Sequence, residues 1–188
     1  MHTLQNKLTS LYPEMSRPDL QLVLKKWDVA TYPRHHVLVR EGEYSPYLYY
    51  LAMGAVRTYY HKLDKEVTEW LALEGTFFTS SLGFYRNLPS RLAIAFLEPS
   101  KVFLLHRDQM EALCSHAHGI ERLFRKLLIE HLLVTQQRVD SFHFETAQQR
   151  YEHLLEQNPS IIQRIPLSYI ASFLGMTQET LSRIRNVR

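Results

Sequence analysis

Short apolar runs separated by turn residues dominate the middle of the chain, from about residue 29 to residue 106. They include V-L-V-R-E-G-E, Y-L-Y-Y-L-A-M-G-A-V-R-T-Y-Y, V-T-E-W-L-A-L-E-G and K-V-F-L-L-H. These runs are rich in β-branched and aromatic residues, which suit the half-buried surface of a sheet. Several short strands at close, regular spacing are typical of a barrel or sandwich, so the pattern predicts a β-rich domain.

Helical patterns flank this domain on both sides. Residues 3–11 and 18–26 are predicted helices, and Ser16 is the expected N-cap of the second, because a proline follows in its first turn. Asp108 is predicted to cap a brief helix that ends near Ser115. A further helix is expected at about 146–157, after a break in the pattern at 143–146.

A long helix is predicted from about 119 to 142, a stretch without proline. One face carries Ile120, Leu123, Leu127, Val134 and Ser141, and another carries Phe124, Leu128, Leu132, Val139 and Phe142. Two apolar stripes can serve two neighbours, so we expect one to pack on the β-rich domain and the other on the same helix of a second subunit. The alternative is a helix buried between two domains of a monomer.

The segment I-A-S-F-L-G-M-T-Q-E-T-L-S-R-I-R, residues 170–185, has the spacing of a helix-turn-helix. Ala171 is small enough for a second helix to cross closely, and Gly175 can adopt the left-handed conformation that a sharp turn needs. Thr177 can cap the second helix with its hydroxyl. The apolar contacts between the two helices are expected from Ile170, Leu174, Leu181 and Ile184.

The second helix of this motif would expose a polar face made of Gln178, Glu179, Ser182, Arg183 and Arg185. Arginine can bond bidentately to guanine and glutamine to adenine, and glutamate can accept from cytosine, so these residue types suit base reading. Ser168, Thr177 and Arg185 are expected at phosphates, where helix N-termini help. The alternative is a helical hairpin with a solvated polar face.

The stretch T-Q-E-T-L-S-R-I-R resembles the recognition helix of the CRP/FNR (cyclic-AMP receptor protein) superfamily of bacterial transcription regulators. The run V-L-V-R-E-G-E-Y-S-P-Y-L-Y-Y-L-A-M-G-A-V-R resembles the first strands of the family's β-roll, and L-E-G-T-F-F resembles the run into its ligand loop. The resemblance implies an α+β fold: an N-terminal double-stranded β-roll of the cyclic-nucleotide-binding jelly-roll type, a long dimerisation helix and a C-terminal helix-turn-helix. The implied parts are a sensor-like β-roll domain with N-terminal helices at 1–118, the dimerisation helix at 119–142 and the DNA-binding domain at 143–188.

By the same resemblance, Gln178, Glu179, Ser182 and Arg183 fall where family members touch base edges. Family members commonly carry a β-hairpin wing after the recognition helix, whereas Arg188 follows this helix directly. We therefore expect a helix-turn-helix that lacks a full wing, with either a dispensable wing or a smaller DNA contact.

The ligand loop departs from the pattern of nucleotide-binding members, which carry a Gly-Glu pair and an Arg-Ser or Arg-Thr pair. Thr79 and Ser80 fall where Gly-Glu would be, and Ser90-Arg91 replaces the second pair in reversed order. Loss of the carboxylate removes a charge-assisted hydrogen bond to the ribose, worth roughly 1.5–3 kcal/mol. A reversed Arg91 would point to the other face of a strand. We expect that cyclic AMP is not the ligand, and that any other small effector would meet Thr79, Ser80, Ser81, Ser90 and Arg91.

Composition limits the remaining classes of function. The net charge of +3 and the pI of about 9.0 permit a nucleic-acid partner, and residues 177–188 carry three arginines, including Arg188, against one glutamate. Long apolar stretches and a signal-peptide pattern are missing, so neither a membrane span nor secretion is expected. The single cysteine, Cys114, excludes an intrachain disulfide and points weakly to a cytoplasmic location.

Two other kinds of site are weaker interpretations of the sequence. Cys114, His116 and His118 alternate and could meet one metal ion, although a solvated connector is the favoured interpretation and no metal or other cofactor is predicted. A cupin-type enzyme would need His-x-His on a strand, whereas His35 and His36 are adjacent. The sequence therefore predicts a homodimeric, DNA-binding transcription regulator that is not an enzyme. The alternative is a ligand-binding regulatory module with weak or lost DNA binding.

Overall fold

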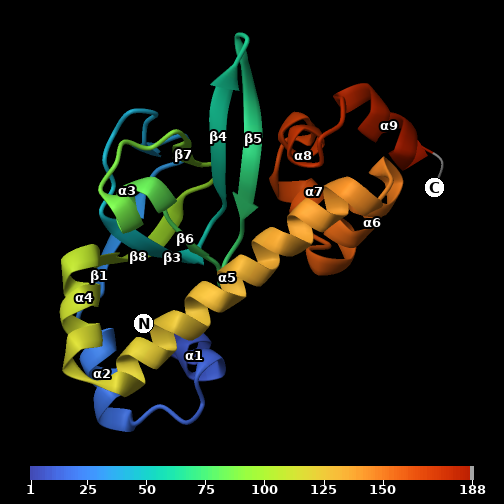
Figure 1. The fold of residues 1–188 in the computed structure, drawn as a ribbon. Helices are drawn as coiled ribbons and strands as arrows, with labels where there is room; N and C mark the ends of the chain where they lie inside the picture. Colours follow the sequence, from blue (N-terminus) through green and yellow to red (C-terminus); the bar gives the residue numbers. More distant parts are fainter. Residues whose placement is uncertain (187–188) are drawn as a thin grey trace.

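Two four-stranded antiparallel sheets form a β-roll in this computed structural model, which describes residues 1–186 (Figure 1). Arg188, counted above among the C-terminal charges, lies outside the described residues. The first sheet has the order β1 (Asp28–Tyr32), β8 (Ser100–His106), β3 (Tyr47–Met53) and β6 (Phe77–Phe78). The second has the order β2 (Val37–Val39), β7 (Ala93–Phe96), β4 (Val56–Lys62) and β5 (Lys65–Ala72). The predicted strand-rich domain is confirmed as a double-stranded roll.

Aromatic and aliphatic side chains fill the space between the two sheets. Tyr49 stacks on Phe78 with ring centroids 5.1 Å apart, and Tyr32 stacks on Phe96 at 4.9 Å. The hydroxyl of Tyr49 lies 2.9 Å from that of Ser45, and burial raises the pKa of Tyr49 to about 12. The interior of the roll is therefore a packed core rather than an open barrel.

Helices before and after the roll cover one of its outer faces. They are α1 (His2–Leu11), α2 (Arg17–Leu24) and α4 (Arg107–His116), and they share a hydrophobic core with the first sheet and the start of the next helix. Ser16 caps α2 as predicted, since its hydroxyl accepts from the Asp19 amide at 3.2 Å. The prediction that Asp108 caps α4 is wrong: the ring nitrogen of His106 accepts the bond from the Asp108 amide.

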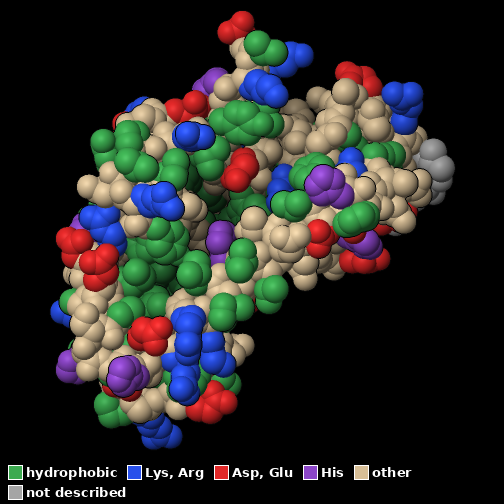
Figure 2. Space-filling model, in the orientation of Figure 1, with side chains coloured by type: hydrophobic (Ala, Val, Ile, Leu, Met, Phe, Trp, Pro, Cys, Tyr) green, Lys and Arg blue, Asp and Glu red, His purple; other side chains and the backbone are tan. Residues whose placement is uncertain are grey.

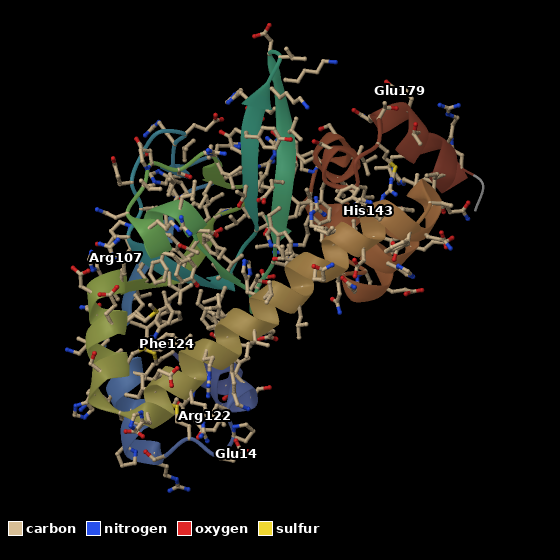
Figure 3. The ribbon with its side chains drawn as sticks, viewed as in Figure 1. Glu14, Arg107, Arg122, Phe124, His143 and Glu179 are labelled. Atoms are coloured by element: carbon tan, nitrogen blue, oxygen red, sulfur yellow. The ribbon has the colours of Figure 1, made fainter. Side chains whose placement is uncertain are left out.

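The helix α5 (His118–Phe144) links the roll to the C-terminal part of the chain and confirms the predicted long helix (Figure 1). Ile120, Leu123 and Leu127 of the first predicted stripe are buried, whereas Val134 of the same stripe is 40% exposed. Phe124 of the second predicted stripe is also buried, so both stripes are covered at the start of α5. Figure 3 shows Phe124 on the side of α5 that faces α4. It lies in the core that the first turns of α5 share with the N-terminal helices and α4.

Four short helices form the C-terminal head, which is α6 (Ala147–Gln157), α7 (Ile161–Arg164), α8 (Leu167–Phe173) and α9 (Gln178–Asn186). The break before α6 is confirmed, and a capping box of Thr146 and Gln149 starts the helix. The sequence did not predict α7, nor α3 (Ser81–Arg86) in the roll, because four and six residues are too few to show a helical period. Among residues 1–186, none of the helices has the length and apolar character needed to cross a bilayer.

Candidate nucleic-acid interface

A Schellman motif makes the turn between α8 and α9. The amide of Gly175 donates to the carbonyl of Ser172 at 3.1 Å, and the amide of Met176 donates to that of Ala171 at 3.0 Å. Gly175 has φ +67°, the left-handed conformation that this motif places after the helix end. The turn is therefore the one that the glycine in the sequence motif predicts.

The two helices are held by the apolar side chains that the sequence assigns to the inside. Ile170 and Leu181 are fully buried, Leu174 is 4% exposed, and Ile184 packs against them. Ala171 is 1% exposed, which fits its predicted role of letting α9 cross α8 closely. Burial of this seam leaves the opposite face of α9 to the solvent.

The outward face of α9 carries every residue predicted to read bases, since Gln178, Glu179, Ser182 and Arg183 are all exposed. Figure 3 shows Glu179 on the outer side of the head, away from the roll. A hydrogen bond from the Thr177 hydroxyl lowers the pKa of Glu179, so the carboxylate is ionised at neutral pH and can only accept. A donor such as the amino group of cytosine would meet that requirement.

The residues predicted at phosphates flank this face. Ser168 in the first turn of α8, Thr177 and Arg185 are exposed. The hydroxyl of Thr177 accepts from the Thr180 amide at 3.2 Å and so caps the start of α9. The N-terminus of α9 adjoins the exposed polar face, and a helix N-terminus suits an anionic oxygen.

Side chains from α5 and α6 brace the turn, and sequence analysis did not single out these contacts. Arg150 donates to the carbonyl of Leu174 at 2.9 Å and to that of Glu145 at 2.7 Å. A Cβ on Gly175 would lie 2.6 Å from the ring of Phe142. Phe142, which the sequence analysis placed in the second apolar stripe of α5, therefore also packs against the turn at Gly175.

Arg138 joins α5 to the end of α8. Its guanidinium donates to the carbonyl of Phe173 at 2.8 Å and lies 3.8 Å from the centre of that ring. Burial lowers the pKa of Arg138 to about 10, which still leaves it charged at neutral pH. The spacing of Arg138 and Phe142, one helical turn apart, is the signal in the sequence that could have indicated a second face directed at the head.

The second half of α5 presents unpartnered apolar side chains. Large hydrophobic residues exposed by 43–62% here are Leu128, Ile129, Leu132, Leu133 and Val139. Leu128, Leu132 and Val139 belong to the second predicted stripe, whereas Ile129 and Leu133 were in neither stripe. A contiguous exposed stripe of this kind typically marks a protein contact.

A hollow lies between the roll, α5 and the head, beside the surface where the head contacts the roll (Figure 2). It is a cavity of about 670 Å³ with walls from Trp70, Phe77, His131, Val134 and Phe173, among others. Its size lies in the usual range for small-molecule sites. The cavity lies between the parts of the chain and outside the packed interior of the roll.

Of the five residues predicted to meet an effector, only Thr79 lines this cavity, and its hydroxyl donates to the carbonyl of Tyr47 at 2.7 Å. Ser80 and Ser90 are buried, and the Ser90 hydroxyl donates to the carbonyl of Leu92 at 2.6 Å. Ser81 and Arg91 are exposed. Arg91 lies in the bend before β7 and not on a strand, so the argument from strand alternation does not apply to it.

Known proteins resemble both the roll and the chain as a whole. Residues 29–117 match the family model of the cyclic nucleotide-binding domain. FixK2 from Bradyrhizobium japonicum has a similar structure, with 24% identity, 85% of this chain and 83% of that chain covered, and a TM-score of 0.71. The c-di-GMP responsive global regulator CLP of Xanthomonas campestris is 16% identical, with 91% of this chain and 90% of that chain covered and a TM-score of 0.69. The Thermus thermophilus catabolite activator protein is 22% identical, with 94% of this chain and 85% of that chain covered and a TM-score of 0.58.

The roll is similar to a cyclic nucleotide-binding domain over residues 29–117, and the chain has the CRP/FNR fold. The predicted fold class and resemblance are thereby confirmed. No curated protein sequence matches the chain. Since the structural relatives share less than a quarter of their residues with it, the CRP/FNR likeness establishes the fold, and the function has to be argued from the chain's own residues.

The remaining candidate site in this CRP/FNR-like chain involves Cys114, His116 and His118. They lie at the junction of α4 and α5, where Cys114 is partly buried and burial raises the pKa of its thiol. Within residues 1–186, no group of three or more histidine, cysteine or acidic side chains is arranged to hold a metal ion. His35 and His36 are both exposed on the turn before β2.

Proposed function

We propose that this protein is a homodimeric transcription regulator that reads a roughly palindromic operator with one α9 helix from each subunit. The observation that carries the proposal is the helix-turn-helix itself. Its turn and apolar seam are fully formed, and it presents glutamine, glutamate, serine and arginine on an open face. A helix stabilised only as part of a core would not need this combination of a buried seam and an unobstructed polar face.

The roles follow from the chemistry of each group. Arg183 would bond bidentately to a guanine, and Gln178 to an adenine, while Glu179 would accept from a cytosine. Ser182 would contact a neighbouring base edge. Ser168, Thr177 and Arg185 would hold phosphates and fix the register of the helix in the major groove.

The proposed dimer uses the exposed stripe of α5, with Leu132 as its most exposed member at 62%. Pairing two such stripes would bury both and relate the heads by a two-fold axis. The proposed functional division is therefore a sensor-like roll at 1–118, a dimer helix at 119–142 and a reading head at 143–188. A two-fold dimer would read half-sites about one DNA turn apart.

We also propose that cyclic AMP does not control this regulator. The roll interior is filled by aromatic rings, and the five candidate effector residues do not converge on one space. A small effector of another kind could occupy the cavity between the roll, α5 and the head. The same cavity favours the second candidate function, a ligand-binding module whose DNA reading is weak.

The deciding experiment selects bound duplexes from a random DNA pool, with Arg183→Ala in parallel. We expect a two-fold symmetric motif in which the variant relaxes one base position per half-site, at a cost of about 1–3 kcal/mol. Arg34→Ala, which removes an exposed charge from the roll, is the matched control and should retain the full motif. Enrichment of no motif, with and without a small-molecule extract, would reject DNA reading in favour of the ligand-binding module.

A further inference from the structure

The reading head is docked on the roll of its own subunit through an apolar seam. The buried core of the head, including Ile161 and Ile165, continues into Ala55 and Leu97 of the roll. Ala55 is fully buried and Leu97 is 7% exposed. Because the head and the roll share one hydrophobic core, we do not expect them to move as domains joined only by a flexible linker.

Arg164, at the end of α7, fastens one side of this seam. Its guanidinium donates to both carboxylate oxygens of Glu74, at 2.7 and 2.8 Å, and to both of Glu98, at 2.6 and 3.0 Å. It also donates to the carbonyl of Gly54 at 3.2 Å. These three partners lie in three different turns of the roll, so one planar fork ties them all to the head.

Arg57, on β4, fastens the other side. Its side chain is only 4% exposed, with the Thr68 hydroxyl at 2.9 Å and a hydrogen-bonded ion pair to Glu66. Its guanidinium lies 4.5 Å from the centre of the Tyr59 ring on the same strand and 3.8 Å from the centre of the Tyr169 ring on α8. The roll and the head together bury this arginine, and the Tyr169 ring is the head's share of that contact. A guanidinium stacked on an aromatic face is stabilised by cation–π attraction.

A backbone amide of the roll also donates a hydrogen bond across the contact between the roll and the head. The amide of Thr68, on the edge strand β5, donates to the Ser172 hydroxyl on α8 at 2.8 Å. Figure 1 shows the β4–β5 hairpin extending beyond the roll alongside α8. The head therefore supplies the partner that this edge amide would otherwise find in water.

We propose that Arg164 and Arg57 are positioning residues for DNA reading: they clamp the head to the roll and so fix the spacing and orientation of the two α9 helices in the dimer. Neither side chain belongs to the reading face, and the clamp leaves that face open. The orientation of the head is set by the roll, and not only by the junction at residues 145–146. This inference rests on the proposed function for its consequence, and on the contacts alone for the clamp itself.

The clamp is tested first without DNA, by hydrogen exchange of the Thr68 amide measured by NMR. We expect Arg164→Gln to speed this exchange by about 10-fold or more, because local opening of the docked head exposes the amide. Arg164→Lys keeps the charge but loses the forked guanidinium, so its Thr68 exchange rate should lie between those of the parent and Arg164→Gln. Arg34→Gln is the control for loss of one exposed arginine. Equal exchange in all four proteins would overturn the clamp.

The second measurement compares the affinities for a full operator and for a duplex with one half-site. Two heads held at the right spacing gain from binding together, so we expect Arg164→Gln to lose about 10-fold or more on the full operator and to keep its half-site affinity. Equal losses on both duplexes would show a merely structural role and contradict positioning. Tyr169→Leu, which removes the head's ring from Arg57 and leaves the Tyr59 contact in the roll, gives the same comparison should Arg164→Gln fold poorly. If the parent binds neither duplex, the proposed function fails, while the exchange result still decides on the clamp.

Discussion

Substitution of Gly175 by alanine tests the turn that presents the recognition helix. The residue has φ +67°, and a left-handed conformation costs a residue with a Cβ about 1–2 kcal/mol. The new Cβ would also lie 2.6 Å from the Phe142 ring, which would have to shift. Moving the ring off its rotamer adds about 0.5–1.5 kcal/mol, because Arg138 and Arg150 pack over it at 4.9 and 5.4 Å. We expect Gly175→Ala to lower the free energy of unfolding by about 2–3 kcal/mol.

The two contributions separate in matched variants measured by urea unfolding. Gly175→Asn should cost less in φ strain but keep the ring contact, because asparagine tolerates the left-handed region. Gly175→Ala combined with Phe142→Leu should keep the strain and lose the clash. Gly119→Ala is the control: this glycine lies in the first turn of α5 without a positive φ, and its new Cβ would meet the flexible end of the Asp19 side chain at 3.1 Å, so we expect a much smaller change in stability than for Gly175→Ala. A Gly175→Ala protein as stable as the parent would refute the described turn.

Three further results are expected. Leu132→Glu should convert the dimer to a monomer in analytical ultracentrifugation, whereas Leu63→Glu, at an 88% exposed hairpin tip, should leave it intact. Calorimetric titration with cyclic AMP or cyclic GMP should give no micromolar binding, and such binding would refute our view of the roll. Hydrogen bonds from Arg164 lower the pKa of Glu74 from 4.5 to about 2, so its stabilising contribution is complete above pH 4.5 and is lost as the pH falls towards 2. The stability difference between the parent and Glu74→Gln should therefore be largest near neutral pH and shrink below pH 4; a gap that does not change with pH would contradict the ion pair.

Local signals in the sequence were sufficient for the strands, the long helix and the helix-turn-helix. The turn at Gly175 and the anchors around it depend on contacts within a few positions, so the motif alone predicted them. The cap of α4 was missed because a histidine in an extended conformation, His106, accepted the bond expected of Asp108. Phe124 is buried, unlike the other members of its stripe, because the N-terminal helices share its core, and no periodicity within α5 can reveal that.

The clamp was missed for a related reason. Arg164 finds its carboxylates 66 and 90 positions away, and Arg57 finds Tyr169 on a different domain. A sequence shows only a basic residue in each place, and most such residues are solvated. Long-range polar contacts of this kind depend on how finished elements dock, so they follow from the fold and cannot be predicted before it.

The three faces of α5 explain how one helix can serve dimerisation and head orientation together. Its first turns are buried in the core shared with α1 and α2, which fixes the helix to the roll. Beyond Leu127 one face is apolar and exposed, while another carries Arg138 and Phe142 towards the head. A partner helix on the exposed face would set the two-fold axis, and the contacts on the other face would transmit that axis to both turns at Gly175. An effector in the neighbouring cavity would touch Arg138 directly, so its binding free energy would act on the position of the head rather than on the reading residues.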